Sequence, residues 1–146
     1  MRVAKFAVAT AIVTSFLLGC GDDSATAPAP TGPQGSNGLT VLSPNGGETF
    51  QIGGSIAVAW SYTNADFSSA RILLGCETDQ WFDLTASSVS PSILDTVLSI
   101  PDSVYSSAQR KKIAFPSGNS CRLKIQDYTI SAIADVSDGN FTVKAR

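Results

Sequence analysis

The stretch from Leu39 to Trp60 constrains the fold of this chain more than any other, because short apolar runs alternate in it with glycine-containing turns. The run from Ser55 to Tyr62, at the end of this stretch, repeats with a period of two, so that Ile56, Val58 and Trp60 fall on one face. A period of two with β-branched and aromatic residues on one face is typical of a half-buried β-strand. The pattern predicts that Trp60 is a core residue rather than a platform for a ligand.

Similar short runs continue to the end of the chain. We expect strands over residues 39–42, 48–52, 55–62, 70–76, 80–84, 92–100, 121–127 and 139–144. Residues 105–120 are polar, and we expect a long loop there with one helical turn. Short strands separated by turn residues, without a sustained period of 3.6, are typical of an all-β sandwich. The sequence therefore predicts an antiparallel β-sandwich of about seven strands over residues 39–146.

The first 20 residues have the features of an export signal. Arg2 and Lys5 precede an apolar run of 13 residues, Phe6–Leu18, which is too short to span a bilayer and fits the core of a signal peptide. The following Leu17–Cys20 resembles a bacterial lipobox, in which the peptide is cut before the Cys and that Cys is lipidated. The alternative is a plain signal peptide with an incidental Cys20. We expect a lipid-anchored protein of the bacterial cell envelope, on the outer membrane or cell surface rather than the inner membrane.

A polar segment separates this signal from the strands. Residues 24–38 are rich in Pro, Gly and Ser and contain no large apolar side chain, so we expect a flexible spacer. The predicted organisation is a signal peptide over 1–19, a lipidated Cys with a linker over 20–38, and one domain over 39–146.

Composition excludes several classes of function. Residues 20–146 contain eight Lys/Arg against twelve Asp/Glu, a formal charge of −4, which gives no electrostatic footprint for nucleic acid. The chain has no His, which excludes Ser-His-Asp and Cys-His nucleophile systems. It has no phosphate-binding glycine loop, and we expect no cofactor.

The two ends of the predicted domain resemble a known family. Ser43–Glu48, SPNGGE, precedes the Ile-x-Val-x-Trp of residues 56–60, and Cys121–Ile125 is followed by the closing DVSDGNFTV of residues 135–143. Over residues 39–144 this is similar to the Ig-like domain at the N-terminus of fungal cell-wall β-1,6-glucan synthesis proteins, also described as Ser/Thr-rich GPI-anchored membrane proteins. The resemblance implies an Ig-like, fibronectin-III-like sandwich and a cell-surface setting.

The Ig-like arrangement also implies a disulfide. With Cys20 assigned to lipid, Cys76 and Cys121 remain as a pair in an exported protein, where disulfides persist. In an Ig-like sandwich the end of the third strand lies beside the start of the sixth, which would bring Cys76 next to Cys121. The alternative is two buried free thiols. Two Cys without His cannot supply a structural zinc site, and we expect no metal.

Acidic residues offer few sites for catalysis. Glu77, Asp79 and Asp83 cluster in the sequence, and a pair of carboxylates can catalyse glycoside hydrolysis, although a solvated turn also explains them. Glu48 belongs to the family motif and is expected to be structural. An envelope hydrolase that uses Glu77 and Asp83 is thus the least favoured of our functional hypotheses.

Two further groups of polar residues have a functional and a structural interpretation. Asp135, Ser137 and Asp138 could bind calcium, but they lack the usual spacing of a calcium loop, and an Asx turn is favoured. The run Arg110–Lys112 could meet an anionic polymer or lipid head group, but a solvated loop is favoured.

The adjacent aromatic residues Trp81 and Phe82 are the best candidates for ligand binding. They alternate along a predicted strand, so one of them should point outward, where it would either stack on a sugar ring or cover the edge of the sheet. The resulting hypothesis is a non-catalytic, lipid-anchored binding or structural module for polysaccharide or another cell-wall polymer. The alternative is a protein–protein scaffold or assembly subunit of the envelope.

Overall fold

The structure is a computed structural model that describes residues 37–77 and 79–146. The predicted signal peptide, Cys20 and the linker as far as residue 36 lie outside the described residues. The described part is all-β, as predicted, and contains no helix, so none in this part could span a membrane.

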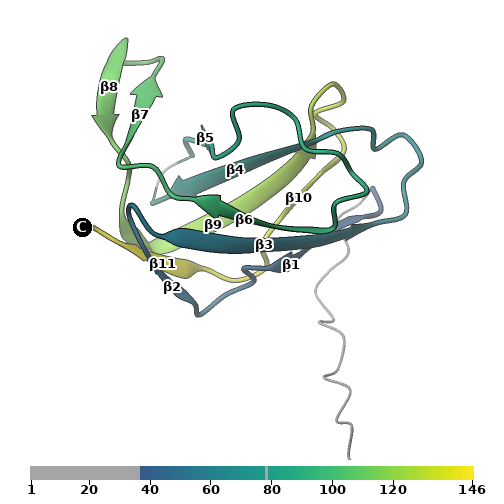
Figure 1. The fold of residues 1–146 in the computed structure, drawn as a ribbon, viewed down its shortest axis with the longest axis horizontal. Helices are drawn as coiled ribbons and strands as arrows, with labels where there is room; N and C mark the ends of the chain where they lie inside the picture. Colours follow the sequence, from purple (N-terminus) through teal and green to yellow (C-terminus); the bar gives the residue numbers. More distant parts are fainter. Residues whose placement is uncertain (1–36, 78) are drawn as a thin grey trace, which may run out of the picture.

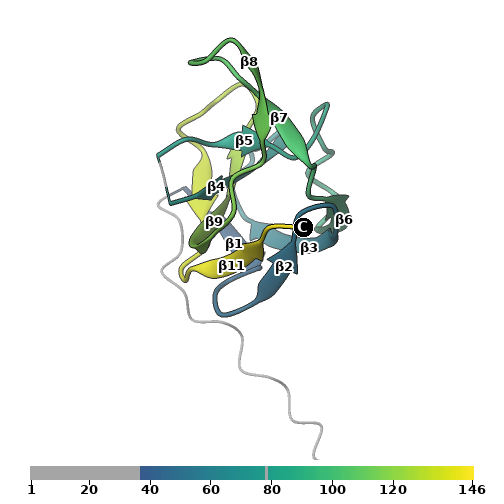
Figure 2. The same ribbon diagram turned by 90° about the vertical axis from the view of Figure 1, so that its left-hand side faces the viewer.

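Eleven strands make up the described part of the chain (Figure 1). They are β1 (Leu39–Ser43), β2 (Thr49–Gln51), β3 (Ser55–Tyr62), β4 (Ala70–Cys76), β5 (Phe82–Asp83), β6 (Asp95–Ser99), β7 (Ser103–Ser106), β8 (Lys111–Ala114), β9 (Gly118–Asp127), β10 (Ala134–Val136) and β11 (Phe141–Lys144). A three-stranded sheet has the order β1-β3-β6, and a larger sheet has the order β2-β11-β9-β4-β5, with β10 paired to β9. The β7–β8 hairpin forms a separate sheet and projects from the body of the molecule (Figures 1 and 2).

The hydrophobic core lies between the two larger sheets. On the β3 side, Ile56, Val58 and Trp60 are all at most 1% exposed, which confirms the predicted inward face. The opposite layer contributes alternate residues of β4, β9 and β11, such as Leu74 and Leu123. β3 alternates buried and more exposed residues, as a strand with one inward face does, whereas β4 is buried along almost its whole length.

The two motif segments at the ends of the domain contact each other. Glu48 accepts hydrogen bonds from the backbone N–H groups of Asn45 and Gly46, both at 2.8 Å, which fixes the turn before β2 and confirms its structural role. Gly139 donates its N–H to the carbonyl of Asn45 at 3.0 Å. A Cβ at Gly139 would lie 2.7 Å from that carbonyl oxygen, so only glycine permits this close approach. The turn and the closing segment therefore form one unit.

β4 and β9 form the longest ladder of the larger sheet and place the two Cys residues opposite each other. Cys76 and Cys121 are register partners, and their Sγ atoms lie 2.07 Å apart, at disulfide distance, as the sequence predicts. The bond would join two neighbouring strands of one sheet at the end of the sandwich from which the hairpin projects.

Several predicted details of the chain were wrong. The loop with a helical turn expected over residues 105–120 is instead the β7–β8 hairpin followed by the start of β9. β10 was not predicted, and the strands number eleven rather than about seven in the described residues. The sandwich is also not wholly antiparallel, because β2 and β11 pair in parallel.

The last two residues of the predicted linker, Asn37 and Gly38, contact the domain. Gly38 accepts a hydrogen bond from the N–H of Thr63 at 2.7 Å, and the carbonyl of Asn37 accepts one from Asn64 at 3.0 Å. These contacts hold the last two residues of the predicted linker against the loop that follows β3.

Candidate functional site around Trp81

Trp81 packs on the outer face of the larger sheet, above Gly75, which has no side chain to displace the ring. After β4 the chain turns back over the sheet, and the Trp81 ring lies above Gly75. A Cβ at Gly75 would lie 2.8 Å from the carbonyl oxygen of Gln80 and 3.3 Å from the indole. The Lys124 ammonium lies 5.8 Å from the centre of the ring, within the range of a cation–π contact. The indole therefore has a defined position, although it is partly exposed.

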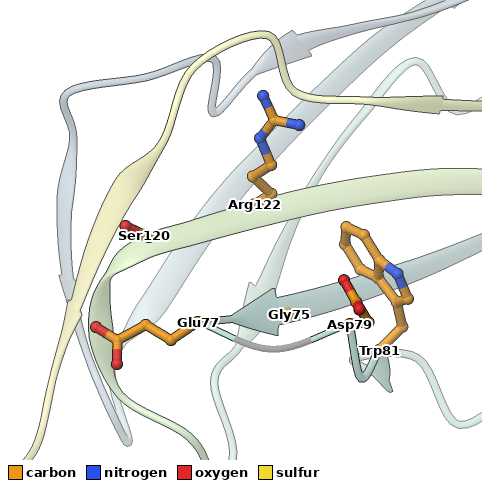
Figure 3. A pocket seen from close by; sticks show the side chains of 6 residues that line it. All are labelled: Gly75, Glu77, Asp79, Trp81, Ser120 and Arg122. Carbon is orange, nitrogen blue, oxygen red and sulfur yellow. The ribbon is translucent and has the colours of Figure 1, made fainter.

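A depression of about 350 Å³ opens beside this ring (Figure 3). It is lined by Gly75, Glu77, Asp79, Trp81, Ser120 and Arg122. The Arg122 guanidinium donates to the side chain of Asn140 and to the carbonyl of Asp138, each at 3.1 Å, and is fixed by these contacts. We call this the Trp81 depression. It combines an aromatic face with a fixed guanidinium, a hydroxyl and two carboxylates. These groups supply the hydrogen-bond donors and acceptors that a hydroxyl-rich ligand requires.

Two further depressions, of about 290 and 340 Å³, lie between Trp81 and the β7–β8 hairpin. Both are lined by Trp81, Phe82, Tyr105 and Ser107. We call them the hairpin depressions. Trp81 thus borders all three hollows, which are open depressions rather than a single enclosed pocket. The contribution of Tyr105 was missed from the sequence, where it belonged to the predicted loop.

Phe82 plays a different part from its neighbour. It is 9% exposed, belongs to the core, and packs against Phe115 with ring centres 5.8 Å apart. Of the two predicted aromatic candidates, Trp81 therefore presents its ring to solvent, and Phe82 supports the site from below.

The carboxylates proposed for hydrolysis are not brought together. Asp83 accepts two hydrogen bonds from the Arg71 guanidinium, and the two form an ion pair. Glu77 accepts the backbone N–H of Asn119 at 3.1 Å. Glu77 lines the Trp81 depression, whereas Asp83 lines a hairpin depression. Each carboxylate has a structural partner, and the two face different hollows.

The acidic residues near the last strand also contact the protein itself. Asp135 accepts the N–H of Val41 at 2.8 Å, and its burial raises its pKa. Ser137 accepts the N–H of Leu123, and Asp138 exchanges hydrogen bonds with Asn45. Within residues 37–77 and 79–146, no cluster of three or more His, Cys, Asp or Glu side chains could hold a metal ion. These contacts give the segment a structural role, but through hydrogen bonds to distant parts of the chain rather than through the expected Asx turn.

Asp127 is the principal polar residue that the sequence did not identify. It is fully buried at the end of β9, where its two oxygens accept hydrogen bonds from Ser68 and Ser69 before β4 and from Thr129 and Ile130 after β9. Burial acts to raise the pKa of Asp127, but these hydrogen bonds outweigh it and hold the pKa well below its usual range. Asp127 and Cys121 lie at opposite ends of the β4–β9 ladder, and Asp127 lines none of the three depressions. Its role is therefore structural.

The basic run lies on the projecting hairpin. Lys111 and Lys112 begin β8, and Arg110 ends the preceding turn with a φ of 52°. All three are exposed. Lys112 is the register partner of Tyr105, so the two side chains share one face of the hairpin.

No protein-family model and no curated protein matches this chain. The resemblance to the fungal glucan-synthesis domain accordingly rests on the motif residues alone.

Proposed function

We propose that this chain is a lipid-anchored protein of the bacterial cell envelope whose β-sandwich, Ig-like in type, is a non-catalytic module that binds polysaccharide. Cys20 would carry the anchor, and the linker would hold the domain off the membrane. The observation that carries the proposal is the position of Trp81, which is partly exposed, fixed above Gly75, and shared by three surface hollows.

The form of the site supports a polymeric ligand. A sugar ring offers C–H groups on its faces and hydroxyls on its edge, and the face of an indole is the electron-rich partner for such C–H groups. Arg122 and Ser120 on one side and Ser107 on the other offer polar contacts for hydroxyls. Open hollows that share the Trp81 ring suit a chain that passes over Trp81 better than a single small molecule.

The test is polymer binding by the full chain, solubilised in detergent, with Trp81→Ala and a matched control. Tyr128 is an aromatic residue that is 60% exposed and lies outside all three depressions, so Tyr128→Ala provides that control. We expect saturable binding to a cell-wall polysaccharide that Trp81→Ala abolishes and Tyr128→Ala leaves unchanged. The fluorescence of the buried Trp60 reports whether the variant is folded. A folded wild-type chain that binds no polysaccharide would contradict the proposal.

The hydrolase hypothesis has a separate test. If an envelope hydrolase activity is detected, Glu77→Gln and Asp83→Asn should abolish it. Activity that persists in both variants would end this hypothesis.

A scaffold role is the second candidate, and the free edge of the three-stranded sheet favours it. β6 is the outer strand of that sheet, and Val97 at its centre is 68% exposed, with Ile93 and Leu94 exposed nearby. Antiparallel pairing of two copies centred on Val97 would set Asp95 against Ser99, so no like charges would meet. Light scattering that shows a monomer at high protein concentration, with no co-purifying partner, would count against this role.

A further inference from the structure

We infer that the polymer bound at Trp81 is an acidic polysaccharide, and that its anionic groups are received by the β7–β8 hairpin. This inference rests on the proposed polysaccharide-binding function and names the chemical class of the ligand. It follows from the distribution of charge, from the position of Tyr105, and from the direction in which the hairpin projects.

The hairpin concentrates the cations that have no partner within the described residues. Eight of the ten Lys/Arg lie in this part of the chain. Four of them are engaged: Arg71 with Asp83, Arg146 with Asp102, Arg122 with Asn140 and the Asp138 carbonyl, and Lys124 with the Trp81 ring. Of the other four, Arg110, Lys111 and Lys112 are consecutive on the hairpin, and only Lys144 lies elsewhere.

The segment around these cations contains no acid. Residues 103–121 include no Asp or Glu, although residues 20–146 as a whole carry a formal charge of −4. A positive hairpin on an acidic molecule attracts anions locally while the rest of the surface repels them. This contrast favours a ligand that places its anionic groups at the hairpin over a ligand whose anionic groups also contact the rest of the domain.

An aromatic ring stands directly beside one of the cations. Tyr105 is 62% exposed and is the register partner of Lys112, so ring and ammonium share one face. Tyr105 also lines both hairpin depressions together with Trp81. A sugar unit between the two rings can present its C–H face to an aromatic side chain while its carboxylate or other anionic group lies near Lys112. The carboxylates Glu77 and Asp79 line the Trp81 depression and neither hairpin depression. Asp83 does line one hairpin depression, but its charge is paired with that of Arg71, so it opposes the anion only weakly.

The direction of the hairpin favours a polymer over a lipid surface. Leu39, at the start of the domain, pairs with Tyr62 at the end of β3, whereas the hairpin adjoins the start of β3 through the hydrogen bond from Gly53 to Ile100. The hairpin and the first described residues therefore lie at opposite ends of the sandwich (Figure 1). A tether that attaches at the first end joins the domain at the end remote from the cations, so it does not hold them against the anchoring bilayer.

The experiment compares three soluble polymers on the full chain in detergent micelles: polygalacturonate, neutral dextran, and polyglutamate, which is acidic but has no sugar. We expect polygalacturonate to bind at least about tenfold more tightly than dextran or polyglutamate. Tyr105→Ala, and the double variant Lys111→Gln, Lys112→Gln, should each weaken that binding about tenfold. The matched controls Tyr128→Ala and Lys144→Gln should change it less than about twofold. Binding should also weaken as ionic strength rises from about 0.1 M to about 1 M, because the screening length falls from about 10 Å to about 3 Å.

The other outcomes are distinguishable. Trp81-dependent binding of dextran, equal to that of polygalacturonate and unaffected by the lysine variants, would overturn this inference and leave the proposed function standing. Equal binding of polyglutamate would show attraction by charge alone and would overturn it too. Displacement by soluble short-chain phosphatidylglycerol, but not by oligogalacturonate, would assign the hairpin to lipid instead. Absence of binding to every polysaccharide would overturn both the inference and the proposed function.

Discussion

At the scale of single residues, Asp127 does more to join separate segments than any other polar side chain described here. Its carboxylate contacts the chain before β4 and the turn after β9, so one buried group connects segments about 60 positions apart in the sequence. A buried carboxylate is stable only when its lone pairs are satisfied, and here Ser68, Ser69, Thr129 and Ile130 satisfy them. The side chain therefore works as a fixed connector of two loops.

We predict that Asp127→Asn lowers the free energy of unfolding by about 3 kcal/mol at neutral pH. The amide removes the charge from several hydrogen bonds and turns N–H groups toward N–H donors, which leaves buried donors unsatisfied. Urea unfolding followed by tryptophan fluorescence, to which the buried Trp60 contributes, measures the change. Asp95→Asn, which removes the same charge from an exposed position, should alter stability by less than about 0.5 kcal/mol. Equal effects of the two variants would refute the connector role.

The same residue predicts how stability depends on pH. The pKa of Asp127 in the folded protein is lowered, so its contribution is fully present above the pKa of about 3.9 of an unfolded Asp and is lost as pH falls through the folded value. The stability difference between wild type and Asp127→Asn should accordingly shrink as pH falls below about 4. Thermal unfolding from neutral to strongly acidic pH measures this difference. A difference that stays constant below that pH would contradict the prediction.

At the scale of elements, the β4–β9 pair links the core to the candidate site. Its inward residues belong to the core, and its outer face carries Gly75 beneath Trp81 and Arg122 beside it. The pair ends at Cys76 and Cys121, close to the loop that positions Trp81. Stability at this end of the ladder should therefore bear directly on the geometry of the site.

We predict that the double variant Cys76→Ala, Cys121→Ala loses roughly 4 kcal/mol of unfolding free energy. The chain-entropy model gives this magnitude for a disulfide that closes a loop of 45 residues. Urea unfolding should show that a reductant destabilises the wild type by a similar amount and has no effect on the double variant. Mass spectrometry that finds two free thiols in protein exported to an oxidising compartment would contradict the pairing.

Strands were predictable where one face is buried. β3 and β4 were predicted with their observed bounds, because their apolar residues mark the inward face or fill the strand. The hairpin was missed because Ser103–Ser106 and Lys111–Ala114 cover no large part of the core, so their residues are mostly exposed and show no clear alternation. β10 was missed because a strand of three partly buried residues is held by its neighbour β9 rather than by its own pattern.

The candidate site was predictable only in part, for a related reason. Two adjacent aromatic residues in a strand indicate that one of them faces outward, but only the packing of Phe82 against Phe115 determines which one. The contribution of Tyr105 depends on the fold of the hairpin, which brings a residue 24 positions further along the chain to the same hollows as Trp81. The basic run Arg110–Lys112, which could meet an anionic polymer, was the signal in the sequence that pointed to this hairpin.

At the scale of the whole molecule, the domain has two distinct ends. The described residues begin at one end of the sandwich, and the β7–β8 hairpin projects from the other (Figure 1). If Cys20 carries a lipid, the spacer that follows it leads to the end opposite the hairpin. The proposed binding site would then lie at the end of the domain remote from its attachment to the linker, an arrangement that suits capture of a polymer outside the membrane.

This arrangement requires that Cys20 is the anchor, and that can be tested without knowledge of the ligand. We predict that Cys20→Ala moves the exported protein from the detergent-rich to the aqueous phase of a detergent partition. Each buried CH₂ group contributes about 0.8 kcal/mol to membrane affinity, so several acyl chains on the wild type would make its release negligible. The control Cys76→Ala removes a thiol from the domain and leaves the lipobox-like motif intact, so this variant should remain in the detergent-rich phase. Mass spectrometry of the wild type should show acyl groups on residue 20. A Cys20→Ala protein that still partitions into detergent would refute the lipid anchor. Polymer binding by this variant would then show whether the site at Trp81 works independently of the membrane.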